Sequence, residues 1–347
     1  MDIHGIFSQF SIMNFFKHPG GVLGPKQIES LKTVQSRTDT YSKKAFAKLK
    51  SITPLDYKPC VIKHVNIGPY GKGQGHKEFT NDCTQAYLQV LMWIITNDKR
   101  HCDVSVKIIN AWCQGCEKFE GSNAPLEAAW GITALVRAAE LLKYTWSGLN
   151  GMNGMNGWPS ETEKHLMVFI DKLMWPVLTT RYNEIIRWKN NWILTIIEAL
   201  LQISIFKNDL KTFNKYVKEF GDICTCCIYP SGQNSETKRD LMHCAFQIGS
   251  QIQIAEMCHH QGLNMYDCLY ITLEYHAGIL NGVIPENVKQ DELKYVWFTH
   301  SAWTVGLNHF ENRVKRPMPQ LRKLIERHTP EQALFNWGPG WVHFQTY

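Results

Sequence analysis

Apolar residues recur every third or fourth position along most of the chain, a spacing that predicts amphipathic helices. Clean alternation of apolar and polar residues, which would predict strands, is scarce. Short polar joints favour antiparallel helix pairs and an all-α fold, either an open solenoid or an (α/α) toroid. The helices are predicted over residues 84–96, 103–116, 126–144, 162–178, 191–206, 210–225, 235–260, 266–280, 296–310 and 319–327.

Capping residues mark where two of these helices are expected to begin. Asn81 and Asp82 form a plausible N-cap for the first predicted helix. A later helix is expected to begin at Ser235, capped by Ser235 itself or by Thr237, and Thr237 with Asp240 has the spacing of a capping box.

Two glycine-rich segments interrupt the helical pattern. Residues 64–76 form a loop that is too long and too rich in glycine to be a tight turn alone. Residues 146–158 repeat Gly-x-Asn, which is typical of a flexible loop, and we interpret it as a slack insertion rather than a substrate lid. We expect residues 1–347 to form one helical domain that carries both loops.

The charge balance is modest, because 37 Lys and Arg residues against 31 Asp and Glu residues give a net charge of +6. This excess favours an anionic partner, although an ordinary solvated surface accounts for it equally well. No block of basic residues is present, so nucleic acid is not indicated as a partner.

The eleven cysteines are odd in number and lie mostly in apolar helical stretches, which favours reduced thiols over a disulfide scaffold. Cys113-x-x-Cys116 and residues 224–227 raise the question of zinc, but no second pair follows at a suitable spacing. We therefore expect no metal and no cofactor, and we interpret the cysteines as small hydrophobic residues.

The first 16 residues are patchily apolar and lack the basic start and cleavage site of a signal peptide. No apolar window reaches the length of a membrane span without polar interruption. The sequence therefore predicts a soluble protein that is intracellular or released without a leader.

The sharpest chemical signal lies in residues 231–243. In a helix, Glu236, Arg239 and His243 fall at positions i, i+3 and i+7 and share one face. A carboxylate, a guanidinium and an imidazole then lie together near a helix N-terminus, where an anion is favoured. A solvated face with one ion pair is the alternative interpretation.

Two further clusters have both a structural and a functional interpretation. Asn190 and Asn191 can simply cap the helix that follows, or an amide can line a sugar site together with the ring of Trp192. Tyr275, within the helix predicted over 266–280, is a core residue by default.

A set of short segments follows one another in a specific order along the chain: 16–20 (FKHPG), 68–71, 75–76, 81–82, 108–112 (IINAW), 138–142 (AAELL), 191–192 (NW), 236–243 (ETKRDLMH), 261–266 and 274–277 (EYHA). In this order they resemble the alginate-lyase superfamily of polysaccharide lyases. The similarity is greatest to the branch with glucuronan- and alginate-cleaving enzymes and an Arg-Asp-x-x-His helix. The wider superfamily often has Asn-Asn-His where this chain has residues 190–192 (NNW), which leaves His243 as the main candidate base.

The resemblance implies an (α/α) barrel or incomplete toroid with a central groove, and cleavage of a uronic-acid polysaccharide by β-elimination. That reaction removes the C5 proton of a uronate, which is weakly acidic because a carboxylate anion lies next to it. Arg239 and Asn191 are the candidates for neutralising this carboxylate, since arginine offers a planar fork of donors. His243 is the candidate base, because histidine changes charge near neutral pH.

A tyrosine is expected to protonate the leaving oxygen, and Tyr70 and Tyr275 are both candidates. His76 could replace either the acid or the base, and Glu236 is expected to orient the arginine or the histidine. The residues expected to bind the anionic polysaccharide are Glu236, Trp192, His76, Asn190, Asp240 and Gln247.

Two other classes of protein remain open. A glycoside hydrolase on a similar toroid would need two well-separated carboxylates, and Glu236 and Asp240 are too close on one helix to serve. A non-catalytic acidic-glycan-binding protein is kept because the histidine of Asn-Asn-His is missing. The sequence leaves open which uronate polymer is cut, whether attack is internal or from an end, and the oligomeric state.

Overall fold

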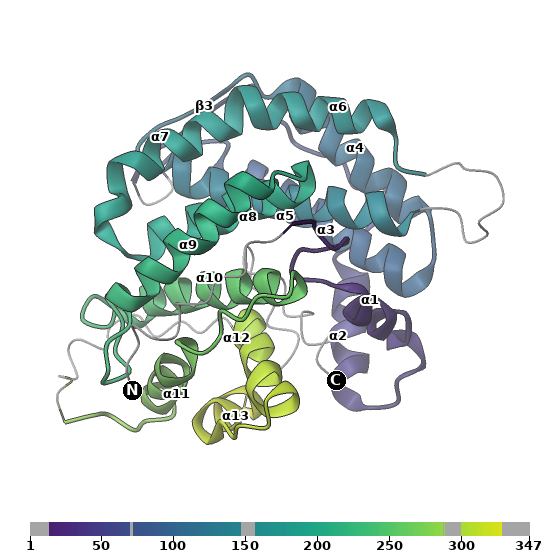
Figure 1. The fold of residues 1–347 in the computed structure, drawn as a ribbon. Coiled ribbons are helices and arrows are strands. Elements are labelled where there is room, and N and C mark those ends of the chain that lie inside the picture. The colour runs from purple at the N-terminus through teal and green to yellow at the C-terminus, as the bar shows by residue number, and fades with distance from the viewer. Residues whose placement is uncertain (1–13, 70–71, 147–156, 287, 289–299, 328–347) are drawn as a thin grey trace. The chain divides into compact units, whose positions relative to one another are not determined.

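The computed structural model describes residues 14–69, 72–146, 157–286, 288 and 300–327. The chain divides into two compact units, each built mainly of helices (Figure 1). The N-terminal unit is His18–Glu184, and the C-terminal unit is Ile185–Tyr347 together with Met1–Lys17. The single domain expected over residues 1–347 stays a prediction.

Two long, almost fully buried helices, α3 and α5, lie at the centre of the N-terminal unit. They pack against each other and against α4, and α6 packs on α4. Their sequences are apolar on nearly every side, as expected for helices covered by neighbours all round. The helices of this unit are α1 (Pro25–Lys32), α2 (Thr40–Ser51), α3 (His76–Thr96), α4 (Arg100–Gly115), α5 (Ala124–Thr145), α6 (Ser160–Phe169) and α7 (Trp175–Ile185). A π-helical stretch, Ile170–Met174, separates α6 from α7, where a single helix was predicted.

A small sheet accompanies these helices. β1 (His64–Ile67) pairs antiparallel with β2 (Gly73–Gln74) and parallel with β3 (Lys118–Glu120). The predicted glycine-rich loop therefore contains two short strands. Gly73 has φ +112°, and a Cβ there would lie 2.0 Å from the carbonyl oxygen of Asn66, so only glycine fits.

The N-cap predicted at Asn81 and Asp82 is wrong, because α3 already begins at His76. Asp82 lies inside the helix and is 1% exposed. Its carboxylate accepts hydrogen bonds from the hydroxyl of Tyr57 at 2.6 Å and from the indole N–H of Trp112 at 2.7 Å. The sequence pattern indicates a local cap at this position, whereas the structure shows a buried acid that binds donors distant in the chain.

The C-terminal unit is organised around α8 and α10, which are also buried along most of their length. α8 packs against α9 and α10, and α10 packs in turn against α11 and α12. The helices are α8 (Asn191–Lys207), α9 (Leu210–Cys227), α10 (Leu241–His260), α11 (Leu269–Leu280), α12 (His300–Leu307) and α13 (Pro319–Glu326).

The helix predicted from Ser235 begins six residues later, at Leu241. Residues 235–239 form turns, and Asp240 is the N-cap, with its carboxylate 2.8 Å from the backbone N–H of His243. The predicted capping box is therefore wrong, and so is the single helical face for Glu236, Arg239 and His243. The first two of these residues lie before the helix and not on it.

Parts of two predicted segments fall outside the described residues. Of the Gly/Asn loop over 146–158, residues 147–156 are not described, nor are residues 296–299 of the helix predicted over 296–310. Among the residues that are described, no helix combines the length and the apolar character needed to cross a membrane.

Candidate active site

The turn before α10 is anchored by buried side chains. The backbone N–H of Asn234 donates to Oγ1 of Thr237 at 2.8 Å, and this Oγ1 lies 3.0 Å from Nε2 of His276 on α11. Nδ1 of His276 lies 2.8 Å from the carbonyl oxygen of Thr272, so Nδ1 carries the hydrogen and Nε2 accepts from Thr237. Burial lowers the pKa of His276 to about 4, which keeps its ring neutral.

His243 is held by the residue that caps its helix. Its Nδ1 lies 2.7 and 2.8 Å from the two carboxylate oxygens of Asp240. A carboxylate only accepts, so Nδ1–H donates and the lone pair of the neutral ring is on Nε2. The His243 side chain is 17% exposed and the Asp240 side chain 8%. The imidazole is therefore oriented by a fixed anion and partly open to solvent.

Asn191 is the first residue of α8 and is 1% exposed. Neither polar atom of its side-chain amide has a hydrogen-bond partner in the described structure. Its backbone N–H donates to Oε1 of Glu236 at 3.4 Å, and the carbonyl of Glu236 accepts from the N–H of Asp240 at 3.3 Å. A buried amide without partners costs about 1–3 kcal/mol, so it needs an explanation, and a bound ligand supplies one.

Glu236 and Arg239 form a loose pair in the turn. Nη1 of Arg239 lies 3.6 Å from Oε2 of Glu236, whose side chain is 4% exposed, whereas that of Arg239 is 51% exposed. At this distance the contact is longer than a normal hydrogen bond, and the arginine end of the pair is open to solvent. The guanidinium is therefore able to exchange this contact for an incoming carboxylate.

Tyr275 lies on α11 and packs against Leu241 and Cys244 in the first turn of α10. It also contacts the turn, because a Cβ on Gly232 (φ +93°) would lie 2.6 Å from Cβ of Tyr275. The structure thus places Tyr275 beside the start of α10. The other candidate acid, Tyr70, lies outside the described residues.

The remaining predicted residues of this unit have clear structural contacts. Oδ1 of Asn190 accepts from the N–H of Trp192 at 3.2 Å and caps α8. Trp192 is half-buried, 6.2 Å from the ring of Trp188 between centroids. Gln247 is fully buried and accepts a hydrogen bond from the hydroxyl of Ser235 at 2.8 Å. Gln247 therefore ties the turn to the second turn of α10.

His76 belongs to the N-terminal unit, where it opens α3. Its Nδ1 lies 2.9 Å from Oε2 of Glu127, a buried residue in the first turn of α5. The hydrogen bond to Glu127 raises the pKa of His76, against the opposing effects of burial and of Lys77. Thr80 is also within 3.4 Å of the same carboxylate oxygen.

A model of the alginate lyase family matches residues 27–270, well over half of the 347 residues. The chain belongs to the alginate lyase family. It is a polysaccharide lyase, so the predicted class of enzyme is confirmed. The membership does not favour the glycoside hydrolase or the non-catalytic binding protein.

Solved alginate lyase structures share the fold of this lyase. Alginate lyase A1-III from Sphingomonas species A1 has a TM-score of 0.67 at 11% identity, over 96% of this chain and 99% of that chain. An alginate lyase from Bacteroides ovatus has a TM-score of 0.64 at 11% identity, over 95% and 99%. A histidine-to-alanine variant of A1-III complexed with a tetrasaccharide has a TM-score of 0.65 at 11% identity, over 95% and 97%. The likeness confirms the predicted (α/α) toroid class. No curated protein sequence matches the lyase.

Sequence reasoning missed the side chains that orient the predicted site residues of the lyase. Thr237 and His276 fix the turn, and Glu127 fixes His76. For Glu127 a signal existed, since it is the only charged residue in the largely apolar stretch over residues 126–136. An isolated acid in such a stretch indicates a buried partner.

Across the described ranges, no group of three or more His, Cys, Asp or Glu side chains is arranged to hold a metal ion. All eleven cysteines are free thiols.

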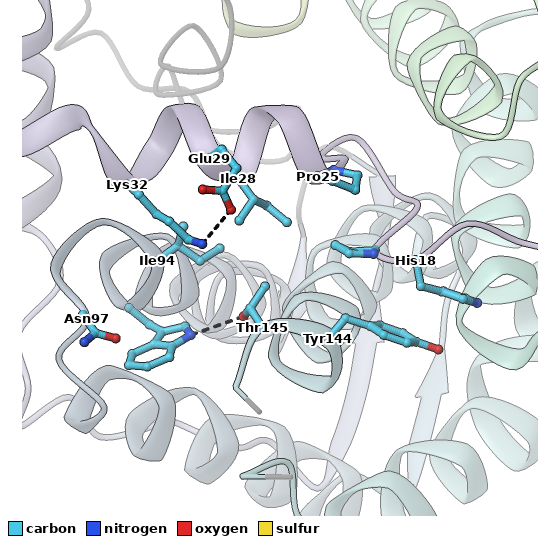
Figure 2. Close-up of a pocket in the computed structure, with 11 residues that line it drawn as sticks. His18, Pro25, Ile28, Glu29, Lys32, Ile94, Asn97, Tyr144 and Thr145 are labelled. Carbon is cyan, nitrogen blue, oxygen red and sulfur yellow. Dashed lines mark hydrogen bonds and ion pairs between the residues drawn. The ribbon is translucent and has the colours of Figure 1, made fainter. Parts of the chain in front are cut away.

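A cavity of about 400 Å³ lies in the N-terminal unit, between α1 and the C-terminal ends of α3 and α5 (Figure 2). None of the predicted site residues lines it. Its volume is within the range of ligand pockets in proteins. The lining residues are His18, Pro19, Pro25, Ile28, Glu29, Lys32, Trp93, Ile94, Asn97, Tyr144 and Thr145.

Proposed function

We propose that this lyase cleaves a uronic-acid polysaccharide, glucuronan-like or alginate-like, by β-elimination and releases unsaturated oligosaccharides. The observation that carries the proposal is the linked set at the start of α10. The unpartnered side-chain amide belongs to Asn191, whose backbone N–H donates to the carboxylate of Glu236. The backbone carbonyl of Glu236 accepts from the N–H of Asp240, the residue that orients His243. This set offers a carboxylate-binding group and an oriented base in one connected structure.

Neutralising the uronate carboxylate is the first requirement of the reaction. The proton on C5 becomes acidic only when the charge that develops on the carboxylate is stabilised. The buried N–H₂ of Asn191 and the guanidinium of Arg239 are the proposed donors. The N–H₂ of Asn191 has no protein partner within the described residues, and the arginine provides a planar fork of donors.

Proton removal is assigned to His243. The Nδ1–H···Asp240 bond leaves the lone pair on Nε2, which takes the C5 proton. The electron pair of the C5–H bond forms the C4=C5 double bond as the C4–O bond breaks. Asp240 stabilises the imidazolium that results, in the way a carboxylate supports histidine in other enzymes.

The leaving oxygen must receive a proton as the C4–O bond breaks. Tyr275 is a proposed donor because it lies beside the turn and the start of α10. Tyr70 remains the second candidate. Both would act as general acids from the phenol hydroxyl.

The rest of the predicted set is assigned to substrate binding. His76, whose ring is oriented by Glu127, is proposed to donate a hydrogen bond to the saccharide. Trp192 offers a ring face to a sugar. Glu236, Asp240, Asn190 and Gln247 act mainly by holding the turn and the helix ends in place.

The names of related structures agree with a saccharide substrate. Alginate lyase A1-III variants, one histidine-to-alanine and one tyrosine-to-phenylalanine, are each complexed with a tetrasaccharide. The proposed base and acids in this chain are of the same two residue types.

The test is a panel of glucuronan, alginate and other polyuronates, with neutral glucans as controls. Absorbance of the new C4=C5 double bond in the ultraviolet should rise with at least one polyuronate and with no neutral polymer. New reducing ends that appear without this absorbance would show hydrolysis and contradict β-elimination. No new ends on any polyuronate would contradict the substrate class.

A further inference from the structure

Two segments that resemble the family, 18–20 and 138–142, meet at one edge of the cavity in the N-terminal unit. Nδ1 of His18 lies 2.7 Å from Oε1 of Glu140, and the N–H of Gly20 donates to the same oxygen at 3.2 Å. Glu140 is 1% exposed, so these bonds take the place of water around its charge. The ring of His18 stacks on Tyr144, with 4.4 Å between centroids and 9° between planes. A buried carboxylate therefore fixes both rings at the cavity edge.

The other end of the cavity carries exposed polar groups. Nζ of Lys32 lies 2.6 Å from Oε1 of Glu29 on α1, and both side chains are largely exposed. Asn97 ends α3 in the left-handed region, with φ +58°. Figure 2 shows Glu29, Lys32 and Asn97 at one end and His18 with Tyr144 at the other.

The middle of the cavity is apolar. Ile28 and Ile94 line it, and both are buried. The indole N–H of Trp93 donates to Oγ1 of Thr145 at 3.2 Å, which fixes the tryptophan ring. An apolar centre with polar groups at both ends suits an elongated ligand that has both C–H faces and hydroxyl groups.

The charges of the lining favour a sugar over a strongly charged ligand. Lys32 is balanced by Glu29, and His18 by Glu140, so there is no uncompensated cation for a phosphate or an anionic cofactor. Ammonium, carboxylate and amide groups can bind vicinal hydroxyls, and aromatic faces stack on the C–H face of a pyranose. A hydroxyl-rich ring matches this combination.

We propose that this cavity is a second saccharide-binding site, which holds a pyranose ring of a polysaccharide chain without cleaving it. It shares no residue with the candidate active site. Within the N-terminal unit it lies at the far end of α3 from His76, roughly 25 Å or more along the helix. The proposal rests on the saccharide substrate of the proposed function, but not on the chemistry of cleavage.

The experiment uses the full chain with His243→Ala, so that no turnover disturbs the titration. The indole N–H signal of Trp93, assigned by its loss in Trp93→Phe, is followed by nuclear magnetic resonance. A 4-linked uronate tetrasaccharide and a neutral 4-linked glucose tetrasaccharide are the two probes. A saturable shift with either probe supports the site and identifies the kind of sugar it takes. No saturable shift with either probe at millimolar concentration overturns the proposal.

Paired variants separate this cavity from the active site. Lys32→Ala with Asn97→Gly removes two polar groups, and the glycine keeps the left-handed conformation at residue 97. Loss of two hydrogen-bonding groups should weaken binding about tenfold or more at the Trp93 signal. Lys26→Ala, an exposed lysine on the same helix that does not line the cavity, is the matched control and should bind as the parent does.

Equal affinities in the double variant and the control would overturn the assignment. This outcome is independent of the proposed cleavage. A wild-type protein that produces no unsaturated sugar while its Trp93 signal responds would contradict the proposed function and leave the second site standing.

Discussion

The buried polar groups near the two ends of α10 differ in how fully they are hydrogen-bonded. At the end of the helix, Glu256 is 1% exposed, and its two oxygens accept hydrogen bonds from Arg313 at 2.6 and 2.7 Å. The hydroxyl of Tyr266 adds a third bond at 2.6 Å. At the start of the helix, the amide of Asn191 is equally buried, yet neither of its polar atoms has a partner within the described ranges.

The difference distinguishes residues that stabilise the fold, around Glu256, from residues proposed to bind substrate, around Asn191. Burial alone would raise the pKa of Glu256, but hydrogen bonds from Arg313 and His260 outweigh burial and lower it well below its usual range. A saturated cluster of this kind has no capacity left for a ligand. The Asn191 amide at the start of α10 keeps its hydrogen-bonding capacity, as the proposed binding of a uronate carboxylate requires.

Removal of the base should have the largest effect on activity. His243→Ala is expected to lower kcat by about 10²–10⁴-fold, since proton transfer by a positioned side chain contributes that much. The melting temperature should change little, because the side chain is partly exposed and its polar contact is with Asp240, beside an edge contact with the ring of Phe246. His259→Ala, an exposed histidine at the other end of the helix, is the control. Equal rates for the two variants would remove His243 from the mechanism.

Disrupting the cluster of Glu256, Arg313 and Tyr266 should instead lower stability and leave activity unchanged. Arg313→Met leaves the buried Glu256 without its main partner, which should reduce the free energy of unfolding by about 3–5 kcal/mol. Chemical denaturation measures this loss, and kcat of the folded fraction should be retained. Lys218→Met, which breaks an exposed pair with Asp222, should cost under about 1 kcal/mol.

A second substitution tests whether the uncompensated charge of Glu256 causes the loss of stability in Arg313→Met. Adding Glu256→Gln to Arg313→Met removes the uncompensated charge and should restore part of the lost stability. A double variant as unstable as the sum of both single variants would show that packing, and not charge, holds the end of α10.

Replacement of Asn191 should affect activity and stability differently. Asn191→Leu removes the proposed carboxylate donor and should lower kcat by about 10²–10³-fold, as loss of one such donor does elsewhere. Stability should be unchanged or higher, because a buried amide without partners disappears. Asn190→Ala should instead lose about 1 kcal/mol, since its side chain caps α8. A large loss of stability in Asn191→Leu would mean that the amide serves the fold.

The two ends of α10 also show what the sequence could and could not reveal about the fold. The helix interior was predictable because apolar residues run through it with few breaks. Its start was not, since residues 231–240 offer several polar residues that can cap a helix. The choice of Asp240 depends on Thr237 binding His276, a residue 39 positions away in the chain.

The candidate site was predictable only in part for the same reason. The resemblance to a family pointed to His243 and Asn191, and the local pattern pointed to Asp240. The partner of His76 was not predictable from local pattern, because Glu127 lies 51 positions away on another helix. The unpartnered state of the Asn191 amide is a property of three-dimensional packing that no spacing in the sequence reports.

The smallest effect expected is a pH dependence shared by both ends of α10. His276 fixes the turn at the start, and His309 stacks on Tyr266 near the end. Burial lowers the pKa of each to about 4, whereas histidine in an unfolded chain titrates near 6.5. The unfolded chain therefore binds more protons between these values, and the free energy of unfolding falls as the pH decreases from 6.5 to 4. Each histidine should account for about 1 kcal/mol at pH 5.5.

Substitution assigns this pH dependence to the two residues. Chemical denaturation gives the difference in unfolding free energy between pH 7.5 and pH 5.5. This difference should fall by about 1 kcal/mol in His276→Gln and by about as much in His309→Gln. Glu256 does not contribute there, because its lowered pKa keeps it ionised throughout this range. A pH dependence that both variants retain in full would place the titrating groups elsewhere. A loss confined to His276→Gln would show that only the start of the helix, where the turn depends on a neutral imidazole, is sensitive to mild acid.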